Sequence, residues 1–313
     1  MNPVIEIIEE VPPQILGESP HWDVKTQSLY FVDIIGKSIH KYTPSTRQHA
    51  KATLGNPSFI IPIKTFKDKF VVSQETEIVT LNWDGVSEKV GKVEELPGSN
   101  INADRDGKFN DGKCDSLGRL WIGTIGMDLK NEAVAFGKLY SYQHHLKTHL
   151  ENVSISNGMA WNDSIKKFYY IDSMSGCVDE YDFDLDGGSI IPDTTQRKRI
   201  FITEKVKDLQ KLPDGMTLDT DGNIWVAVFG QKKIVKINPN KPEIILQTIE
   251  IPVKQVTAMA WGGPDLDVLF VTTGNTPLPG YVINAPGDGC LYKITQLGAR
   301  GLPPNDFVLY KQV

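Results

Sequence analysis

One short pattern recurs along this chain of 313 residues and constrains its fold more than any other feature. In its clearest copy, residues 212–228, a polar segment precedes a short apolar strand, the turn Asp221-Gly222-Asn223 and a second apolar strand. A tight Gly-containing turn between two apolar runs is typical of a β-hairpin. The pattern returns every 40 to 57 residues, with copies that begin at Glu18, Ser58, Asn110, Asn157, Asp214 and Thr257.

A repeat of this length, built from several short strands, predicts a β-propeller. One four-stranded sheet cannot bury both of its faces without neighbours, so such repeats pack around a common axis. Six copies therefore predict an all-β, six-bladed β-propeller, with residues 1–313 forming a single domain. The alternative is a set of unrelated hairpins in a β-sandwich, but the turns share one register and helical periodicity is almost absent.

The amino-terminal segment, residues 4–9, alternates apolar and acidic residues and is predicted to form a strand. In propellers an amino-terminal strand often completes the sheet formed by the last residues, which closes the ring. We expect its partner to be residues 290–294, and residues 307–310 are a further candidate for the same sheet.

Composition limits the partners of this chain. The net charge is −6, the pI is about 5.6 and no basic stripe is present, which argues against nucleic acid and favours a cation as guest. The amino terminus lacks the features of a signal peptide, and no apolar run reaches membrane-spanning length. The three cysteines lack metal-ligand spacing and are expected to be free thiols. We therefore expect a cytoplasmic monomer that acts on a small-molecule substrate, away from membranes.

The first residue of every repeat carries a side-chain oxygen. The first strand of a propeller blade lines the central channel, so equivalent residues of the six repeats should lie at one height around the axis. They are Glu18, Ser58, Asn110, Asn157, Asp214 and Thr257. Carboxylates and carboxamides gathered in one channel mouth suit Ca²⁺, Mg²⁺ or Mn²⁺, and are less typical of structural zinc because no Cys or His joins them.

A hard dication with few protein ligands keeps positions open for water and substrate. It can polarise a carbonyl oxygen and make water more acidic, so hydrolysis of a lactone or ester is the chemistry that this set favours. The sequence contains no Gly-x-Ser-x-Gly motif, and Gly17-Glu18-Ser19-Pro20 does not match it. We therefore favour metal-assisted attack by water over a covalent serine mechanism.

Four segments resemble a known family. They are Gly17-Glu18-Ser19-Pro20-His21-Trp22, Phe109-Asn110-Asp111-Gly112-Lys113, Ile155-Ser156-Asn157-Gly158-Met159 and Pro213-Asp214-Gly215-Met216. The chain resembles the family of gluconolactonase, regucalcin and luciferin-regenerating enzyme over nearly its whole length. Residues 59–62 and 81–87 look most like the insect luciferin-regenerating branch. The resemblance implies a six-bladed propeller with one divalent metal ion (Ca²⁺, Mg²⁺, Mn²⁺ or Zn²⁺), and many members hydrolyse sugar lactones.

The resemblance also assigns roles to residues. It implies that Glu18, Asn157 and Asp214 are the metal ligands and that Asp214 is also the general base toward water. Asn110 would contact the substrate, with Asp111 supporting it from beside the site.

Two substrate-binding positions depart from the family pattern. Lys108 stands where the family has an arginine, and Asp128 where it has a glutamate. Lysine lacks the planar guanidinium group and aspartate is shorter, which weakens the prediction of a polyhydroxylated sugar substrate. Arg105 is a candidate to supply the missing guanidinium group.

Three functions remain open from the sequence. The first is a divalent-metal-dependent lactonase, the second a luciferin-regenerating type of enzyme acting on a heteroaromatic, and the third a non-catalytic calcium-binding regulator. Histidines that could suggest another metal site, His144, His145 and His149, are expected on a surface turn. The tryptophans of the repeats are expected to pack between blades: Trp22, Trp121, Trp161, Trp225 and Trp261.

Overall fold

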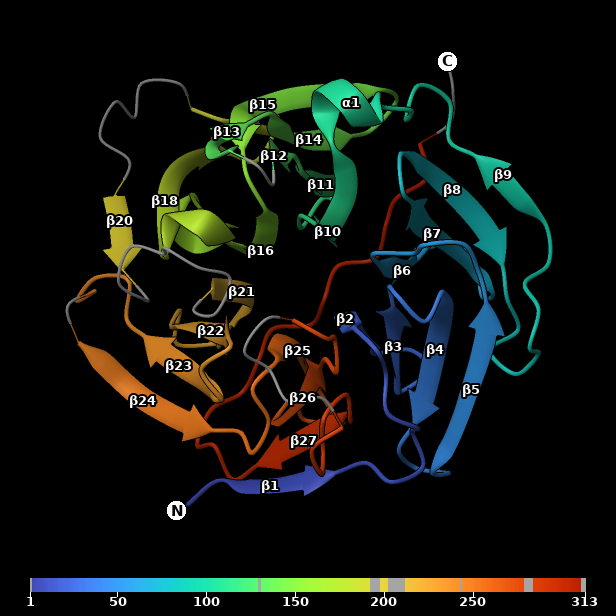
Figure 1. Cartoon of the computed structure of the whole chain (residues 1–313), viewed down its shortest axis with the longest axis vertical. Coiled ribbons are helices and arrows are strands. Elements are labelled where there is room, and N and C mark those ends of the chain that lie inside the picture. Colours follow the sequence, from blue (N-terminus) through green and yellow to red (C-terminus); the bar gives the residue numbers. More distant parts are fainter. Residues whose placement is uncertain are drawn as a thin grey trace.

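The computed structural model describes residues 2–128, 131–191, 198–201, 212–242, 244–278 and 284–310. Within these ranges the chain forms six antiparallel sheets arranged in a ring (Figure 1). The first strand of each repeat lies nearest the centre of the ring, and later strands lie progressively further out. The six-bladed β-propeller predicted from the repeat is therefore confirmed.

The first three blades follow the chain in order. Blade 1 consists of β2 (Gly17–Asp23), β3 (Ser28–Asp33), β4 (Ser38–Thr43) and β5 (Gln48–Thr53). Blade 2 consists of β6 (Ile60–Pro62), β7 (Lys69–Gln74), β8 (Glu77–Asn82) and β9 (Val93–Glu95). Blade 3 consists of β10 (Lys108–Cys114), β11 (Leu120–Ile125), β14 (Gly137–Tyr142) and β15 (Leu146–Val153), with the hairpin β12 (Met127–Asp128) and β13 (Asn131–Ala135) inserted after β11.

The last three blades close the ring. Blade 4 consists of β16 (Ser156–Asn162), β17 (Lys167–Asp172) and β18 (Cys177–Asp184), with β19 (Ser189–Ile190) and β20 (Lys198–Phe201) both paired to β18. It also contains the 3₁₀ turns η1 (Asp163–Ile165) and η2 (Ser173–Ser175). Blade 5 consists of β21 (Leu212–Leu218), β22 (Ile224–Phe229), β23 (Lys233–Ile237) and β24 (Ile245–Glu250). Blade 6 consists of β25 (Val256–Gly262), β26 (Val268–Thr273), β27 (Tyr292–Thr295) and β1 (Val4–Ile7).

The two ends of the chain meet in blade 6, as expected. β1 pairs with β27 in register from Val4 opposite Thr295 to Ile7 opposite Tyr292. Residues 307–310 do not extend this sheet, so that part of the expectation is wrong. Instead Phe307 bridges to Ile63 beside blade 2, because the last segment crosses one end of the channel.

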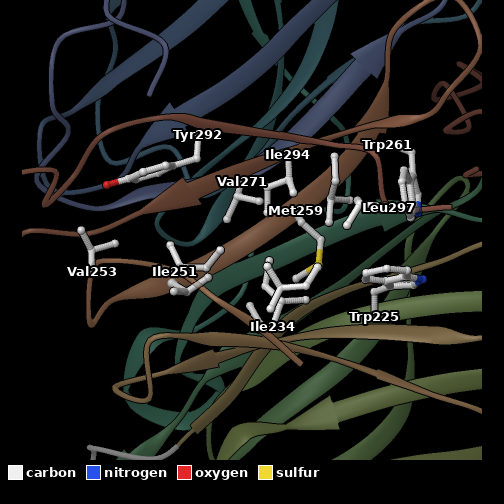
Figure 2. Close-up of a cluster of buried hydrophobic side chains, with 14 of the residues drawn as sticks. Trp225, Ile234, Ile251, Val253, Met259, Trp261, Val271, Tyr292, Ile294 and Leu297 are labelled. Atoms are coloured by element: carbon white, nitrogen blue, oxygen red, sulfur yellow. The ribbon is translucent and has the colours of Figure 1, made fainter. Parts of the chain in front are cut away.

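The core is divided among the interfaces between blades. Six clusters of buried apolar side chains occur in the described residues, one at each interface. Figure 2 shows the cluster between blades 5 and 6, where Trp225 and Trp261 meet edge to face with ring centroids 5.3 Å apart. Trp22 stacks on Phe270 across the next interface. The tryptophans thus pack between blades as predicted, and burial of this area stabilises the ring.

The recurring Asp in the hairpin turn holds the turn closed. Asp219 Oδ1 accepts hydrogen bonds from the backbone N–H groups of Asp221 and Asn223 at 3.0 and 2.9 Å. Its Oδ2 accepts from Trp225 Nε1 at 3.0 Å and lies 2.9 Å from Lys236 Nζ. Although burial acts to raise it, these groups hold the pKa of Asp219 below its usual value. One carboxylate therefore ties the turn to the next two strands.

A histidine pair in blade 1 leads to a prediction on acid stability. His40 is buried, its Nδ1 lies 2.9 Å from His49 Nε2, and burial lowers its pKa to about 3. At His40 the unfolded state binds a proton below about pH 6.5 that the folded state excludes, so the contribution of this histidine to stability should fall as the pH falls through that value. We expect this contribution to fall by about 2 kcal/mol between pH 7.5 and pH 5, read from urea midpoints as the difference in pH dependence between the wild type and His40→Gln. His144→Gln, an exposed control, should keep the pH dependence of the wild type. An equal slope in the wild type and His40→Gln would contradict the assignment.

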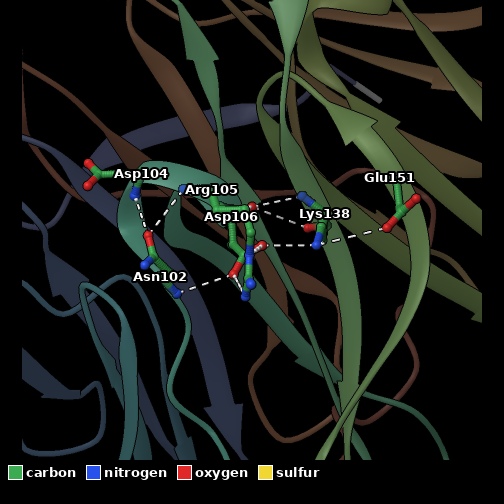
Figure 3. A network of polar contacts seen from close by, with 7 residues as sticks. Asn102, Asp104, Arg105, Asp106, Lys138 and Glu151 are labelled. Atoms are coloured by element: carbon green, nitrogen blue, oxygen red, sulfur yellow. Dashed lines mark hydrogen bonds and ion pairs between the residues drawn. The ribbon is translucent and has the colours of Figure 1, made fainter.

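A network of polar contacts organises the segment before β10. This segment contains the short helix α1 (Ala103–Asp106), whose amino terminus is capped by Asn102 (Figure 3). Hydrogen bonds from Arg105 lower the pKa of Asp106 most strongly, and Lys138 Nζ lies 2.9 Å from the same carboxylate. This network fixes the backbone that leads into β10.

Two further expectations concern cysteines and membranes. Cys114, Cys177 and Cys290 are buried thiols that form no disulfide, as predicted. No helix in the described ranges combines the length and apolar character that crossing a bilayer requires.

Candidate metal centre and active site

The side chains of the repeat positions come from inner strands whose pairing is irregular. In five blades the register between the inner strand and its neighbour shifts. The shifts lie between Glu18 and His21, Phe109 and Gly112, Ser156 and Met159, Pro213 and Met216, and Val256 and Met259. A β-bulge bends its strand and re-aims the side chains at that point. At each bulge the side chains no longer alternate between the two faces of the sheet. The bulges occur at equivalent positions of the five blades, so these side chains lie near one height of the channel.

Glycines let neighbouring inner strands approach closely at this height. A Cβ atom on Gly158 would lie 2.7 Å from the backbone nitrogen of Met216, and one on Gly215 would lie 2.6 Å from the Cβ of Ala258. Side chains cannot be accommodated at these separations without movement of the strands. The glycines that follow Asn157 and Asp214 thus keep blades 4, 5 and 6 close together around the site.

Three carboxyl groups from different blades gather here. Burial, and then the charge of Asp111, raise the pKa of Glu18 to about 8. Burial, and then the charges of Glu18 and Asp111, raise the pKa of Asp214 well above its usual value. Carboxyl groups affect one another this strongly only at close range. Blades 1, 3 and 5 therefore bring three acids near one another.

Asn157 adds an amide oxygen from blade 4. Its Nδ2 donates to Ser173 Oγ at 2.9 Å, which fixes the orientation of the carboxamide. Neither Asn157 Oδ1 nor Asp214 Oδ1 has a hydrogen-bond partner within the described structure, although both atoms are buried. Leaving a buried acceptor without a partner is costly, so adjacent unpartnered oxygens indicate a site for a bound cation. Glu18, Asn157 and Asp214 thus meet, and their hard oxygen atoms fit a divalent ion.

The candidate ligand set is small. No three His, Cys, Asp or Glu side chains in the part of the chain that the structure describes are placed to hold a metal ion together. The set therefore comprises two carboxylates and one carboxamide. Such a set would leave positions for water and substrate, since Ca²⁺ takes six to eight oxygen ligands.

Two of the six repeat positions do not join the site. Ser58 Oγ lies 2.6 Å from Ser73 Oγ inside blade 2. Thr257 Oγ1 donates to the backbone oxygen of Gly17 at 2.6 Å and so ties blade 6 to blade 1. Both hydroxyl groups serve the packing of the ring, so the expectation that all six oxygen-bearing residues form one polar ring is only partly met.

Asn110 and Asp111 lie beside the three candidate ligands. Asn110 Nδ2 donates to the backbone oxygen of Ser156 at 2.8 Å, which links blade 3 to blade 4 next to Asn157. Asp111 Oδ1 accepts from Ser19 Oγ at 2.9 Å. Asp111 therefore contacts the residue after Glu18, consistent with the supporting position expected for it.

The positions expected to bind substrate lie at the edge of blade 3. Lys108 is exposed, and its Nζ lies 3.5 Å from Glu75 Oε1. Asp128 belongs to β12, but its side chain lies outside the described part of the structure. Arg105 is engaged by Asp106, with its Nε 3.0 Å from Asp106 Oδ1. Among the described interactions, neither Lys108 nor Arg105 contacts Glu18, Asn157 or Asp214.

Sequence reasoning missed two residues of this region. Ser19, at φ 46° in the bulge of β2, binds Asp111. Lys113 reaches from blade 3 to blade 5, where its Nζ donates to the backbone oxygen of Met216 at 3.0 Å. The Asn-Asp-Gly-Lys motif contained Lys113, but its spacing carries no sign that the side chain spans the channel. His149 was expected on a surface turn, but it is half-buried and stacks on Trp121 with centroids 4.2 Å apart.

Comparisons with known proteins agree with this architecture. The family described as "SMP-30/Gluconolactonase/LRE-like region" matches residues 16–275. Regucalcin of Sus scrofa is 34% identical over 293 residues, which cover 92% of this chain and 93% of the relative. Regucalcin of Homo sapiens is 32% identical over 296 residues, which cover 93% of this chain and 94% of the relative.

Solved structures give the same result. A structure described as a luciferin-regenerating enzyme superposes with a TM-score of 0.88 at 40% identity and covers 98% of this chain and 100% of its own. A regucalcin from Agrobacterium tumefaciens superposes with a TM-score of 0.78 at 22% identity, covering 97% of each chain, which supports the fold alone. This chain belongs to the SMP-30/gluconolactonase/LRE-like family.

Proposed function

We propose that this protein is a divalent-metal-dependent lactonase that acts in the mouth of the propeller channel. The observation that carries the proposal is the pair of buried oxygens, Asn157 Oδ1 and Asp214 Oδ1, that lack partners beside Glu18. Membership of a family whose description includes gluconolactonase supports lactone hydrolysis. Ca²⁺, Mg²⁺, Mn²⁺ and Zn²⁺ are all candidates, and the all-oxygen set favours the harder ions.

Each candidate residue has a role in this proposal. Glu18, Asn157 and Asp214 would hold the ion, which when bound supplies Lewis acidity for a carbonyl oxygen and for water. Asp214 would also accept a proton from the attacking water, a task suited to a carboxylate whose pKa is raised by burial and by Glu18. Asn110 would orient the substrate, because its Nδ2 is fixed by Ser156 and its Oδ1 is left to accept from a substrate hydroxyl. Lys108 and Asp128 would contact the outer part of the substrate.

The test is hydrolysis of sugar lactones and aromatic lactones by purified protein, before and after removal of metal by a chelator. We expect turnover to fall at least about 100-fold on chelation and to return when one of the candidate ions is restored. Ions should be added back singly, so that the rate order identifies the preferred one. Full activity in chelated protein would contradict the proposal.

Two alternatives would show in the same experiment. The 40% identity to a luciferin-regenerating enzyme favours a heteroaromatic substrate, and aromatic lactones would then be turned over in preference to sugar lactones. The curated relatives named regucalcin favour a calcium-binding regulator. That function would give saturable Ca²⁺ binding without metal-dependent turnover of any substrate tested.

A further inference from the structure

A cavity lies inside the propeller, next to the candidate metal centre. It has a volume of about 290 Å³ and is lined by inner-strand residues of several blades. Ser19, Asp111 and Gly215 form its boundary with the candidate metal centre. None of Glu18, Asn110, Asn157 or Asp214 lines it. We call this space the inner chamber, and it is distinct from the place where the candidate ligands meet.

One part of the inner chamber is polar. The ammonium group of Lys113 donates to the backbone oxygen of Met216, which leaves further N–H groups able to donate to a guest. Asp111 uses Oδ1 to accept from Ser19 and from the backbone N–H of Gly112, and its second oxygen can accept from a guest. A donor and an acceptor thus lie close together, an arrangement that suits a hydroxyl group, which both accepts and donates.

Most of the remaining wall is apolar. The side chains of Ala160, Ala258 and Ala260 each keep 5% exposure although they lie on inner strands, so small groups border the space. Met216 and Met259 supply flexible apolar surface, and the wall is completed by Ile61, Leu218, Trp161 and Trp261. An apolar cavity of about 150 Å³ already binds benzene. The inner chamber therefore has room for one substituted ring.

The carboxyl-terminal segment covers the inner chamber. Residues 302–305 line it, and the next residues anchor this segment to blades 1 and 2. Asp306 lies 2.6 Å from Lys25 Nζ and 3.4 Å from His21 Nε2, and the backbone N–H of Phe307 donates to Pro62. These contacts hold residues 302–305 against the inner chamber.

We propose that the inner chamber is a binding site for a small neutral molecule with one hydroxyl group on an apolar ring or branched body. The hydroxyl group accepts from Lys113 and donates to Asp111, and the body lies against the alanines and methionines. A carboxylate is a poor guest, because it offers no hydrogen to the acceptor oxygen of Asp111 and because the apolar wall cannot solvate its charge. The site is independent of the proposed hydrolysis, since it needs neither bound metal nor the candidate ligands.

The experiment titrates phenol into chelated full-length protein, with ligand-observed NMR or calorimetry as readout. We expect saturable 1:1 binding with a Kd on the order of 1 mM or tighter. Benzoate, which has a similar size and a negative charge, should bind at least about tenfold more weakly. Absence of saturation by phenol, or equal affinity for phenol and benzoate, would overturn the proposal. Chelated protein is used so that failure here is separate from failure of the hydrolysis test.

Two variants locate the guest. Ala260→Leu fills the inner chamber and should weaken phenol binding at least about tenfold, whereas Ala50→Leu, which adds the same atoms on outer strand β5, should not. Lys113→Met keeps the length of the side chain and removes its charge. It should weaken phenol about fivefold or more and leave benzene unaffected, since benzene makes no hydrogen bond. Unchanged phenol affinity in Lys113→Met would overturn the proposed orientation even if Ala260→Leu failed to fold.

Discussion

Asp214→Asn is expected to stabilise the metal-free protein while it removes metal-dependent hydrolysis. Burial and the charges of Glu18 and Asp111 raise the pKa of Asp214 well above its usual value, so folding without metal is penalised by this carboxyl group. An asparagine of the same shape carries no charge, and the free energy of unfolding should rise by about 1–3 kcal/mol at pH 7. Turnover should fall by about 10²–10⁴-fold or more, because both a ligand and the base are lost.

The sign of this effect depends on pH in a defined way. A carboxyl group whose folded-state pKa is raised favours folding at low pH, and its contribution is lost as the pH rises through the folded value. The same holds for Glu18, whose pKa is about 8. The advantage of Asp214→Asn over the wild type should therefore be near zero at about pH 4 and grow toward pH 8, as read from urea unfolding with chelator present.

Asp219→Asn is the matched control. Asp219 is equally buried, but hydrogen bonds from Lys236 and Trp225 hold its pKa below the usual value. Its replacement should lower the free energy of unfolding, on the order of 2 kcal/mol, since Lys236 would lose its partner charge. If both variants were destabilised alike, the acids of the candidate metal centre would not be under electrostatic strain, and the cation-site hypothesis would lose its main support.

The sequence was sufficient to predict the six-bladed propeller because the same hairpin pattern occurs six times. Each copy of the hairpin pattern is weak alone, but the shared register of the turns fixed the number of blades and the position of the inner strands. The same register predicted, without coordinates, that Glu18, Asn157 and Asp214 lie at one height of the channel. In a propeller, residues at equivalent positions of different repeats lie close in space although they are far apart in sequence, and the repeat period can be read from the sequence alone.

The sequence did not predict which side chains of the repeat position point into the site, because this depends on the hydrogen-bond partners available to each one. Ser58 and Thr257 share the repeat position, yet each finds a closer hydrogen-bond partner within the ring than the channel offers. The bulges that re-aim the site residues leave no pattern in residue type, because they are shifts in pairing between two strands. The path of residues 302–307 across the channel is likewise set by contacts such as Asp306 with Lys25, which are 281 positions apart. That path adds one part of the wall of the inner chamber.

Gly158→Ala is expected to damage the candidate metal centre without touching any of its ligands. A Cβ atom at this position would lie 2.7 Å from the nitrogen of Met216 and 2.8 Å from the backbone oxygen of Asp214. The inner strands of blades 4 and 5 must then separate, which moves Asn157 away from Asp214. Overpacking of this kind costs about 1–3 kcal/mol of stability, and the loss of ligand geometry should weaken metal binding at least about tenfold.

Calorimetry should therefore show weaker metal binding by folded Gly158→Ala than by the wild type. A loss of stability alone would leave the metal affinity of the folded protein unchanged. Gly55→Ala is the control, because its added Cβ would meet only the Gln74 side chain, at 3.6 Å or more, and both stability and metal affinity should stay near the wild-type values. A Gly158→Ala protein that is destabilised but binds metal normally would show that this glycine serves packing alone. Weak binding in Gly158→Ala, with Gly55→Ala unaffected, would mean that the close approach of two inner strands sets the spacing of Asn157 and Asp214, and with it the affinity of the site.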